Sequence, residues 1–207
     1  MEGGVAVGDG AVMWRGGERR RIVVGMTGAS GTVYGVRLLE VLRQRPDVET
    51  HLVVSAAGQL TRSLETGYSK EDVDAMADVV YKPSDMAAAI SSGSFQTAGM
   101  AIVPCSMRTL AEIATGVTSG LVSRAADVTL KERRPLVLVA RESPLNLTHL
   151  RNMTAVTEAG GVILPPVPAF YLQPSSVEEI VQQTVDRCLD LLGLPQPDAP
   201  RWTGGGY

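Results

Sequence analysis

The sequence predicts a single doubly wound α/β domain, with a parallel sheet covered by helices on both faces. Short apolar runs rich in β-branched residues alternate along the chain with amphipathic helical segments, the pattern of a parallel sheet. Each run is almost continuously apolar, as expected for strands buried on both faces. The length of 207 residues suits one full-sized domain and is short for two. We assign this domain to residues 20–194, between a Gly-rich leader over 1–19 that we expect to be disordered and a tail over 195–207.

The first elements are a strand, a tight turn and a helix. Ile22–Val24 form the apolar strand, and the small residues Gly28–Gly31 follow it. The helix is indicated by an apolar face made of Tyr34, Leu38, Val41 and Leu42. Free N–H groups at its N-terminus, with the hydroxyls of Thr27 and Ser30, predict a phosphate cradle. A Gly-rich turn also serves where a helix packs closely on a sheet without a ligand, and the motif is neither a Walker A loop nor the full dinucleotide fingerprint.

The same alternation continues to the end of the predicted domain. Further strands are expected at 51–55, 100–104, 136–140 and 161–164. Helices are expected around Leu60 and Leu64 and at about 109–115, 121–131, 147–159 and 177–192. The more polar stretch 68–94 predicts short helices and a loop at Ser91–Ser94, and the Pro-rich stretch 165–174 predicts another loop.

Small, hydroxyl and charged residues stand where the predicted strands end. In doubly wound sheets ligands bind outside the carboxyl ends of the strands, where the strand order reverses. The sequence therefore predicts a ligand site along this edge, built from Gly28–Gly31, Ser55, Cys105-Ser106, Arg141-Glu142 and Pro165–Tyr171.

The residues at this edge favour a mononucleotide over a dinucleotide. A nicotinamide dinucleotide site would place an acidic residue after the second strand, where Ser55 stands. A short-chain dehydrogenase would also need a tyrosine and a lysine one helical turn apart, and no tyrosine here is followed four residues later by a lysine. Hydroxyls suit a ligand with one phosphate and a ribityl chain, such as FMN; they come from Ser30, Ser55, Ser106 and Thr109. A Ser-His-Asp triad is disfavoured, because His51 and His149 lie in plain strand or helix sequence and are interpreted as structural.

Composition excludes several other classes of protein. A formal net charge of −3 gives no electrostatic footprint for nucleic acid or an anionic membrane surface. Two cysteines and two histidines support neither a disulfide framework nor a metal site, and they indicate a reducing, cytoplasmic setting. No apolar run approaches the roughly 18 residues of a membrane span.

A set of short motifs, in order along the chain, resembles the UbiX-type flavin prenyltransferases. The resemblance covers about Arg21 to Trp202, nearly the whole sequence. The motifs are Met26–Gly31 with Tyr34-Gly35, Ser91–Ser94, Pro104–Ser106, Arg124–Val128, Lys131–Leu136, Arg141-Glu142-x-Pro144, Phe170-Tyr171 with Gln173-Pro174, and Arg201-Trp202. Each motif alone is weak, but their joint order and spacing is specific.

The resemblance implies a Rossmann-like flavoprotein domain and a metal-independent, cytoplasmic enzyme that assembles as a homododecamer. Such an enzyme joins a dimethylallyl group from dimethylallyl monophosphate to N5 and C6 of reduced FMN. The product, prenylated FMN, serves a UbiD-type decarboxylase. The tail over 195–207 would reach the active site or a neighbouring subunit.

The resemblance also implies roles for individual residues. FMN would be held by Gly28, Ala29, Ser30, Ser55, Ser106, Met107, Arg108, Thr109 and Arg141. The allyl donor would be bound by Arg124, Lys131, Tyr171, Arg187 and Trp202, with Arg124 placed in some cases by a neighbouring subunit. Catalytic roles would fall to Ser30, Glu65, Lys131 and Glu142. Breaking the allylic C–O bond leaves a carbocation and an anionic phosphate. Cationic side chains would stabilise the phosphate and the electron-rich flavin the carbocation, while Glu142 or the phosphate would accept the C6 proton.

Two alternatives and two open points remain at the level of sequence. The chain could be a non-catalytic FMN-binding carrier, or an FMN-dependent decarboxylase of the same fold acting on a cysteine-containing peptide-like substrate. The second alternative requires a catalytic histidine after a strand, where neither His51 nor His149 stands. Leu172 occupies a position where many relatives carry histidine. The difference lies near the expected site of the allyl phosphate, so the preference for a monophosphate or a diphosphate donor is open. The pathway that uses the product is also open.

Overall fold

A computed structural model describes residues 19–199, 201 and 204 of the chain. It confirms the predicted doubly wound domain, with six parallel strands in the order β3-β2-β1-β4-β5-β6. The strands are β1 (Arg20–Met26), β2 (Val48–Val54), β3 (Val79–Tyr81), β4 (Gly99–Cys105), β5 (Leu136–Ala140) and β6 (Val162–Ile163). The leader predicted over 1–19 lies outside the described residues except for Arg19.

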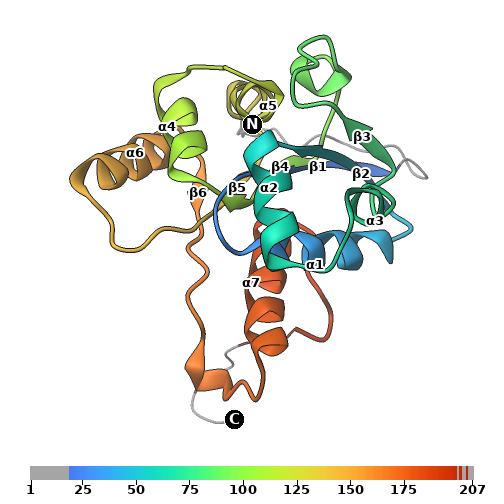
Figure 1. Ribbon diagram of the computed structural model, residues 1–207, viewed down its shortest axis with the longest axis vertical. Helices are drawn as coiled ribbons and strands as arrows, with labels where there is room; N and C mark the ends of the chain where they lie inside the picture. The colour runs from blue at the N-terminus through green and yellow to red at the C-terminus, as the bar shows by residue number, and fades with distance from the viewer. Residues whose placement is uncertain (1–18, 200, 202–203, 205–207) are drawn as a thin grey trace, which may run out of the picture.

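Helices cover both faces of the sheet (Figure 1). On one face α1 packs against α7, and on the other α5 lies across the central strands while α4 packs against α6. The α-helices are α1 (Thr32–Arg43), α2 (Ala56–Glu65), α3 (Lys70–Asp74), α4 (Met107–Thr115), α5 (Leu121–Lys131), α6 (Leu147–Glu158) and α7 (Val177–Leu191). Two short 3₁₀ helices, η1 (Ala89–Ser91) and η2 (Phe170–Leu172), complete the described elements. None of the described helices is both long and apolar enough to cross a membrane.

The core forms two layers because successive strand side chains point to opposite faces of the sheet. In β1, Ile22 and Val24 are buried against α1 and α7, whereas Val23 is buried with the residues of α4 and α5. Both faces of the central strands are therefore apolar, which explains why each strand reads as a continuous apolar run.

The prediction missed one strand, β3. The stretch 68–94 was expected to hold only short helices and a loop, and it does contain α3 and η1. Between them Val79–Tyr81 pairs in parallel with β2 at the edge of the sheet, with Val80 exposed. The apolar pattern of a three-residue edge strand is too short to be recognised from sequence. Such a strand is defined by its pairing with β2, which is a contact between distant residues.

Both histidines have structural surroundings, as the sequence indicated. His51 is 2% exposed, and its ring nitrogens lie 2.8 Å from the Glu49 carboxylate and 2.9 Å from the Tyr81 hydroxyl. Burial lowers the pKa of His51, against the opposing effect of Glu49. His149 takes part in a reciprocal cap with Asn146 at the start of α6.

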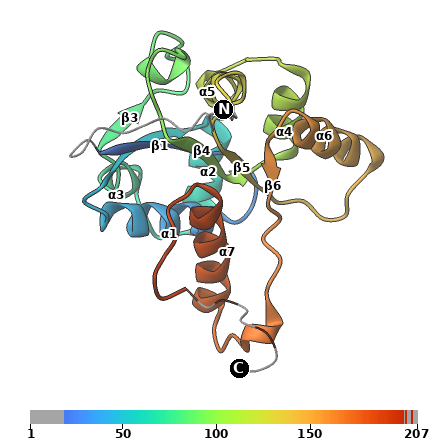
Figure 2. The same ribbon diagram turned by 180° about the vertical axis from the view of Figure 1, so that it is seen from behind.

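An extended arm leaves the sheet after β6. The chain from Leu164 to η2 runs away from the strands and alongside α7, as both views agree (Figures 1 and 2). The arm exposes large apolar side chains, with Val167 at 74% and Phe170 at 72% of full exposure. Large exposed apolar groups on one projecting segment are typical of a surface that another protein chain covers.

Candidate functional site

A cavity of about 330 Å³ opens at the carboxyl ends of β1 and β4, the strands between which the sheet order reverses. Its lining comes from the first turns of α2, α4 and α5 and from the turn after β1. Five of the nine predicted FMN-binding residues line it, namely Gly28, Ser55, Ser106, Arg108 and Thr109. The structure therefore brings most of the predicted cofactor residues together at the predicted edge.

Three helix N-termini face this cavity. Ser55 caps α2 by accepting the N–H of Gly58 at 3.0 Å, and Ser106 caps α4 by accepting the N–H of Thr109 at 3.3 Å. The third helix, α5, follows Gly120, which has no side chain to cap it. Helix N-termini carry partial positive charge and unpaired N–H groups, so their convergence favours the binding of an anion in this cavity.

Gly28 allows the α2 terminus to come close to the turn after β1. A Cβ at this position would lie 2.5 Å from the Cβ of Ala57 and 3.2 Å from its carbonyl carbon. Real Cβ atoms do not approach so closely, so any larger residue would push α2 away. The shape of the cavity depends on glycine here.

The N-terminus of α1 is occupied by the protein itself. The Oε2 atom of Glu65, the last residue of α2, accepts the N–H of Gly31 at 2.9 Å and that of Thr32 at 3.0 Å. The buried hydroxyl of Thr27 bonds the Pro104 carbonyl and accepts the N–H of Ser106, both at 2.8 Å. The prediction that these amides and this hydroxyl cradle a phosphate is therefore wrong, because other groups of the chain already hold them.

Ser30 and Glu65, two of the predicted catalytic residues, lie together. Partial desolvation acts to raise the pKa of the Glu65 carboxyl. Hydrogen bonds from the Ser30 hydroxyl and from the backbone of Thr32 and Gly31 outweigh it and hold the pKa below its ordinary value. At neutral pH the site thus contains an ionised carboxylate hydrogen-bonded to an exposed serine.

Arg141 and Glu142 follow β5 at the same edge. The backbone N–H of Arg141 donates to the Cys105 carbonyl at 3.3 Å, which fixes the end of β5 beside β4. The charge of Arg141 acts on Tyr34 in the first turn of α1, where burial raises the pKa of the phenol and Arg141 opposes the rise. Glu142 is exposed, and its carboxylate accepts the N–H of Ser143 at 3.0 Å. Of the other predicted FMN residues, Ala29 is buried and Met107 packs partly against the core.

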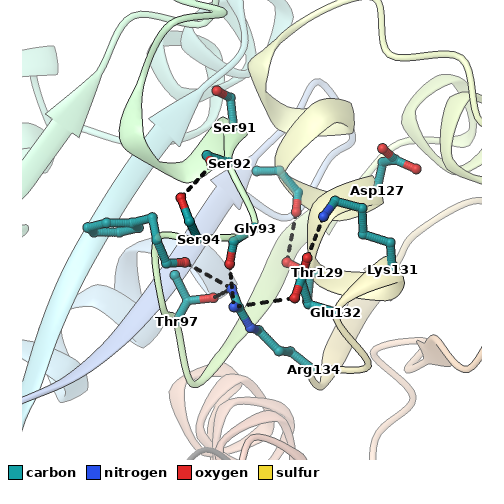
Figure 3. A network of polar contacts seen from close by, with 12 residues as sticks. Ser91, Ser92, Gly93, Ser94, Thr97, Asp127, Thr129, Lys131, Glu132 and Arg134 are labelled. Carbon is teal, nitrogen blue, oxygen red and sulfur yellow. Dashed lines mark hydrogen bonds and ion pairs between the residues drawn. The ribbon is translucent and has the colours of Figure 1, made fainter.

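Arg124 and Lys131, predicted to bind the allyl donor, lie along α5. This helix begins at the cavity and runs back to the start of β5, so its last residue, Lys131, lies toward the amino ends of the strands. Arg124 donates to the Ser91 carbonyl at 3.2 Å and pairs with Asp127 at 2.8 Å. Lys131 lies against the Ser91–Ser94 loop (Figure 3).

Tyr171 and Arg187 line a second cavity, of about 290 Å³, between the arm and α7. Asp190 lies in the same lining and pairs with Arg187 at 3.7 Å. The same carboxylate accepts two hydrogen bonds, of 2.7 and 3.1 Å, from Arg201 of the tail. Trp202, the other predicted donor residue, lies outside the described residues.

Within one chain the predicted site residues thus form three separate groups. The residues predicted to bind FMN gather at the carboxyl edge of the sheet, Lys131 lies toward the opposite edge, and Tyr171 with Arg187 lies between the arm and α7. Sequence reasoning missed Glu112, which lines the cavity at the carboxyl edge of the sheet, and Asp190, which lines the cavity beside α7. Burial opposes ionisation of Glu112, but hydrogen bonds from Ser119, Ser123 and Arg108 hold its pKa below the ordinary value.

Comparison with known proteins agrees with this fold. The model of the Flavoprotein family matches residues 15–189. A relative from Escherichia coli strain K12, named flavin prenyltransferase UbiX, is 57% identical over 187 residues, which are 89% of this chain and 99% of the relative. The chain belongs to the UbiX family of flavoproteins. The resemblance drawn from its motifs is confirmed.

Two solved structures of the UbiX family match over their whole length. AnUbiX (PadA1), solved in complex with FMN and dimethylallyl pyrophosphate, superposes with a TM-score of 0.88 at 54% identity, covering 91% of this chain and 100% of that one. A dodecameric FMN-dependent UbiX-like decarboxylase from Escherichia coli O157:H7 gives 0.86 at 55% identity, covering 89% and 100%. In the described part of this chain, no group of three or more His, Cys, Asp or Glu is placed to hold a metal ion.

Proposed function

We propose that this protein is a flavin prenyltransferase that joins a dimethylallyl group from dimethylallyl monophosphate to N5 and C6 of reduced FMN. The observation that carries the proposal is the cavity on which the N-termini of α2, α4 and α5 converge, lined by residues that match the FMN motif of the UbiX family. Curated relatives at 52–58% identity bear the name of this activity or of a probable UbiX-like one, which supports it further.

The cavity fits the phosphate end of FMN. The hydroxyls of Ser55, Ser106 and Thr109, the N–H groups of the three helices and the exposed Arg108 would bind the phosphate and the ribityl chain. Gly28, Ala29, Met107 and Arg141 would lie along the rest of the cofactor. Reduced FMN, when bound, supplies the electron-rich ring to which the allyl group becomes attached.

Arg124, Lys131, Tyr171 and Arg187 would bind the phosphate of the donor. Breaking the allylic C–O bond leaves the electron pair on the phosphate, so cationic groups and a hydroxyl stabilise the charge that develops there. The lost C6 proton would pass to Glu142 or to the departing phosphate. Ser30, held by the ionised Glu65, would orient or relay a proton beside flavin N5.

We infer that each active site is completed by neighbouring subunits. The donor-binding residues do not gather at the flavin cavity of their own chain, and the projecting arm exposes apolar side chains that an oligomer would bury. The dodecameric structure of a UbiX relative supports such an assembly. A homododecamer would bring Lys131 and Arg124 of one copy, and Tyr171, Arg187 and Trp202 of another, to the flavin of a third.

The product would serve a UbiD-type decarboxylase in the cytoplasm. This part of the proposal rests on the family resemblance alone. A non-catalytic FMN carrier would bind the cofactor equally well, but it would have no use for two separate groups of phosphate-binding cations.

The test is to incubate the protein anaerobically with reduced FMN and dimethylallyl monophosphate, and to measure the mass of the flavin released on denaturation. The proposal predicts a flavin that gains one dimethylallyl unit, and no gain with Lys131→Ala or Glu142→Ala. A flavin that binds but returns unchanged with both mono- and diphosphate donors would assign the protein to the carrier class instead.

A further inference from the structure

Lys131 belongs to a network of polar contacts with Glu132, Arg134 and the Ser91–Ser94 loop (Figure 3). Its ammonium group pairs with the carboxylate of the next residue, Glu132, whose other oxygen lies 3.9 Å from the guanidinium of Arg134. We propose that Glu132 is a positioning residue, which holds the Lys131 ammonium over the Ser91–Ser94 loop for the phosphate of the allyl donor. The inference rests on the donor-binding role proposed for Lys131.

Arg134 gives the network a fixed end. Its side chain is only 8% exposed, and it donates to the carbonyls of Gly93 at 2.8 Å and Phe95 at 3.0 Å and to the Thr97 hydroxyl at 3.3 Å. These three bonds tie the 93–97 loop to the chain that enters β5. Because Arg134 is held, a carboxylate beside it has a defined place as well.

Gly93 shows how closely the two charged groups approach the loop. A Cβ at this position would lie 2.0 Å from Oε1 of Glu132 and 2.5 Å from Nζ of Lys131. Both side chains therefore end directly over the Gly93 backbone. The Ser92 and Ser94 hydroxyls, 2.9 Å apart, flank this point and offer further donors to a phosphate.

The electrostatic surroundings agree with this geometry. The hydrogen bond and charge of Lys131 hold the pKa of Glu132 below its ordinary value, so the carboxylate is ionised at neutral pH. The Lys131 side chain is 46% exposed and would otherwise sample many rotamers. One N–H of its ammonium pairs with Glu132, which leaves two for a phosphate.

The consequence is a lysine that is arranged before the donor arrives. Fixing a flexible lysine on binding costs side-chain entropy, and a counter-ion held by Arg134 removes much of that cost in advance. Glu132 would thus act on donor binding through Lys131, without touching the donor or the flavin.

A double-mutant cycle tests this role. Glu132→Gln keeps the shape of the side chain and removes its charge, Lys131→Met removes the ammonium, and the third variant combines them. We expect Glu132→Gln alone to raise the donor KM and the dissociation constant of inorganic phosphate, the latter measured by calorimetry, about five- to tenfold. The KM for FMN and the oligomer size should stay unchanged. In the Lys131→Met background the same substitution should have no further effect.

The matched control is Glu158→Gln, an exposed glutamate at the end of α6 for which no ion pair appears among the described residues. It should leave both constants unchanged. Gly93→Ala offers a second variant, which should mimic Glu132→Gln by displacing both charged groups.

Three outcomes would overturn the inference. The first is that Glu132→Gln raises the dissociation constant of phosphate equally with and without Lys131. The second is that the substitution tightens phosphate binding, and the third is that it changes neither the donor KM nor the phosphate dissociation constant. The phosphate measurement needs no turnover, so it decides the role of Glu132 even where the wild-type protein fails to prenylate FMN and the proposed function falls.

Discussion

The carboxylate of Glu65 accepts a 2.9 Å hydrogen bond from the N–H of Gly31, so the last residue of α2 caps the first turn of α1. The N–H of Thr32 donates to the same oxygen at 3.0 Å. A helix N-terminus that opens on a ligand edge would ordinarily attract an external anion, and here an internal anion takes that place. We therefore expect the phosphate of the cofactor to bind in the neighbouring cavity, where α2, α4 and α5 begin.

Replacing Glu65 by Gln should destabilise the fold in a pH-dependent way. The folded-state pKa of Glu65 lies below its ordinary 4.5, so the ionised carboxylate stabilises the fold above that pH and loses this effect as the pH falls through the folded pKa. The unfolding free energy should drop by about 1 kcal/mol at pH 7, the usual value of a helix cap. Urea unfolding at pH 7 and pH 3 measures it: the gap between wild type and variant should narrow at low pH, whereas an equal gap at both would contradict the cap.

Gly28→Ala should weaken FMN binding more than it weakens the fold. The new Cβ would meet Ala57 at 2.5 Å, so the first turn of α2 must move and the cavity must change shape. Overpacking of this kind costs about 1–3 kcal/mol. Borne by the binding step, that cost corresponds to an FMN affinity loss of roughly five- to 150-fold, which fluorescence titration measures. Gly67→Ala, at an exposed glycine with nothing within 4 Å of its Cβ, is the control and should bind FMN normally.

Asp190→Asn should release the tail from α7. Asp190 holds Arg201 by two hydrogen bonds and also pairs with Arg187, so removing its charge frees both arginines. Limited digestion with trypsin, followed by mass spectrometry, should show faster cleavage after Arg201. Asp198→Asn, in the same segment but outside these pairs, should be cleaved at the wild-type rate. Equal rates for all three proteins would mean that Asp190 does not anchor the tail.

The fold could be predicted from the sequence because its strands are buried on both faces. Such strands read as continuous apolar runs, and helices with one apolar face lie between them. The strand Val79–Tyr81 was not predicted, because a three-residue edge strand is defined by the strand with which it pairs. The phosphate cradle was misplaced because Glu65, 34 residues from Gly31 in sequence, reaches back to cap α1. No local sequence pattern predicts such a contact.

The site was predictable only in part, because contacts between residues far apart in the sequence leave no local pattern. Ser55 and Ser106 could be placed at the ligand edge from the strands that they end, and both line the cavity. Lys131 came from family resemblance alone. The strand-end pattern placed Pro165–Tyr171 at the ligand edge, and this was wrong for Tyr171, which lines the cavity between the arm and α7 because the chain continues past β6 as an extended arm. Asp190 was missed because its role depends on Arg201 of the tail folding back onto α7.

The most direct test of the account is complementation between subunits. Lys131→Ala and Arg141→Ala chains, carrying different tags, are co-expressed, and oligomers that contain both are isolated and assayed by the mass of the released flavin. Each variant alone should be inactive, and the mixed oligomer should regain part of the wild-type prenyl transfer, because some sites combine an intact Lys131 with an intact Arg141. Mixed oligomers as inactive as either parent, while wild type mixed with Lys131→Ala stays active, would contradict a site shared between subunits.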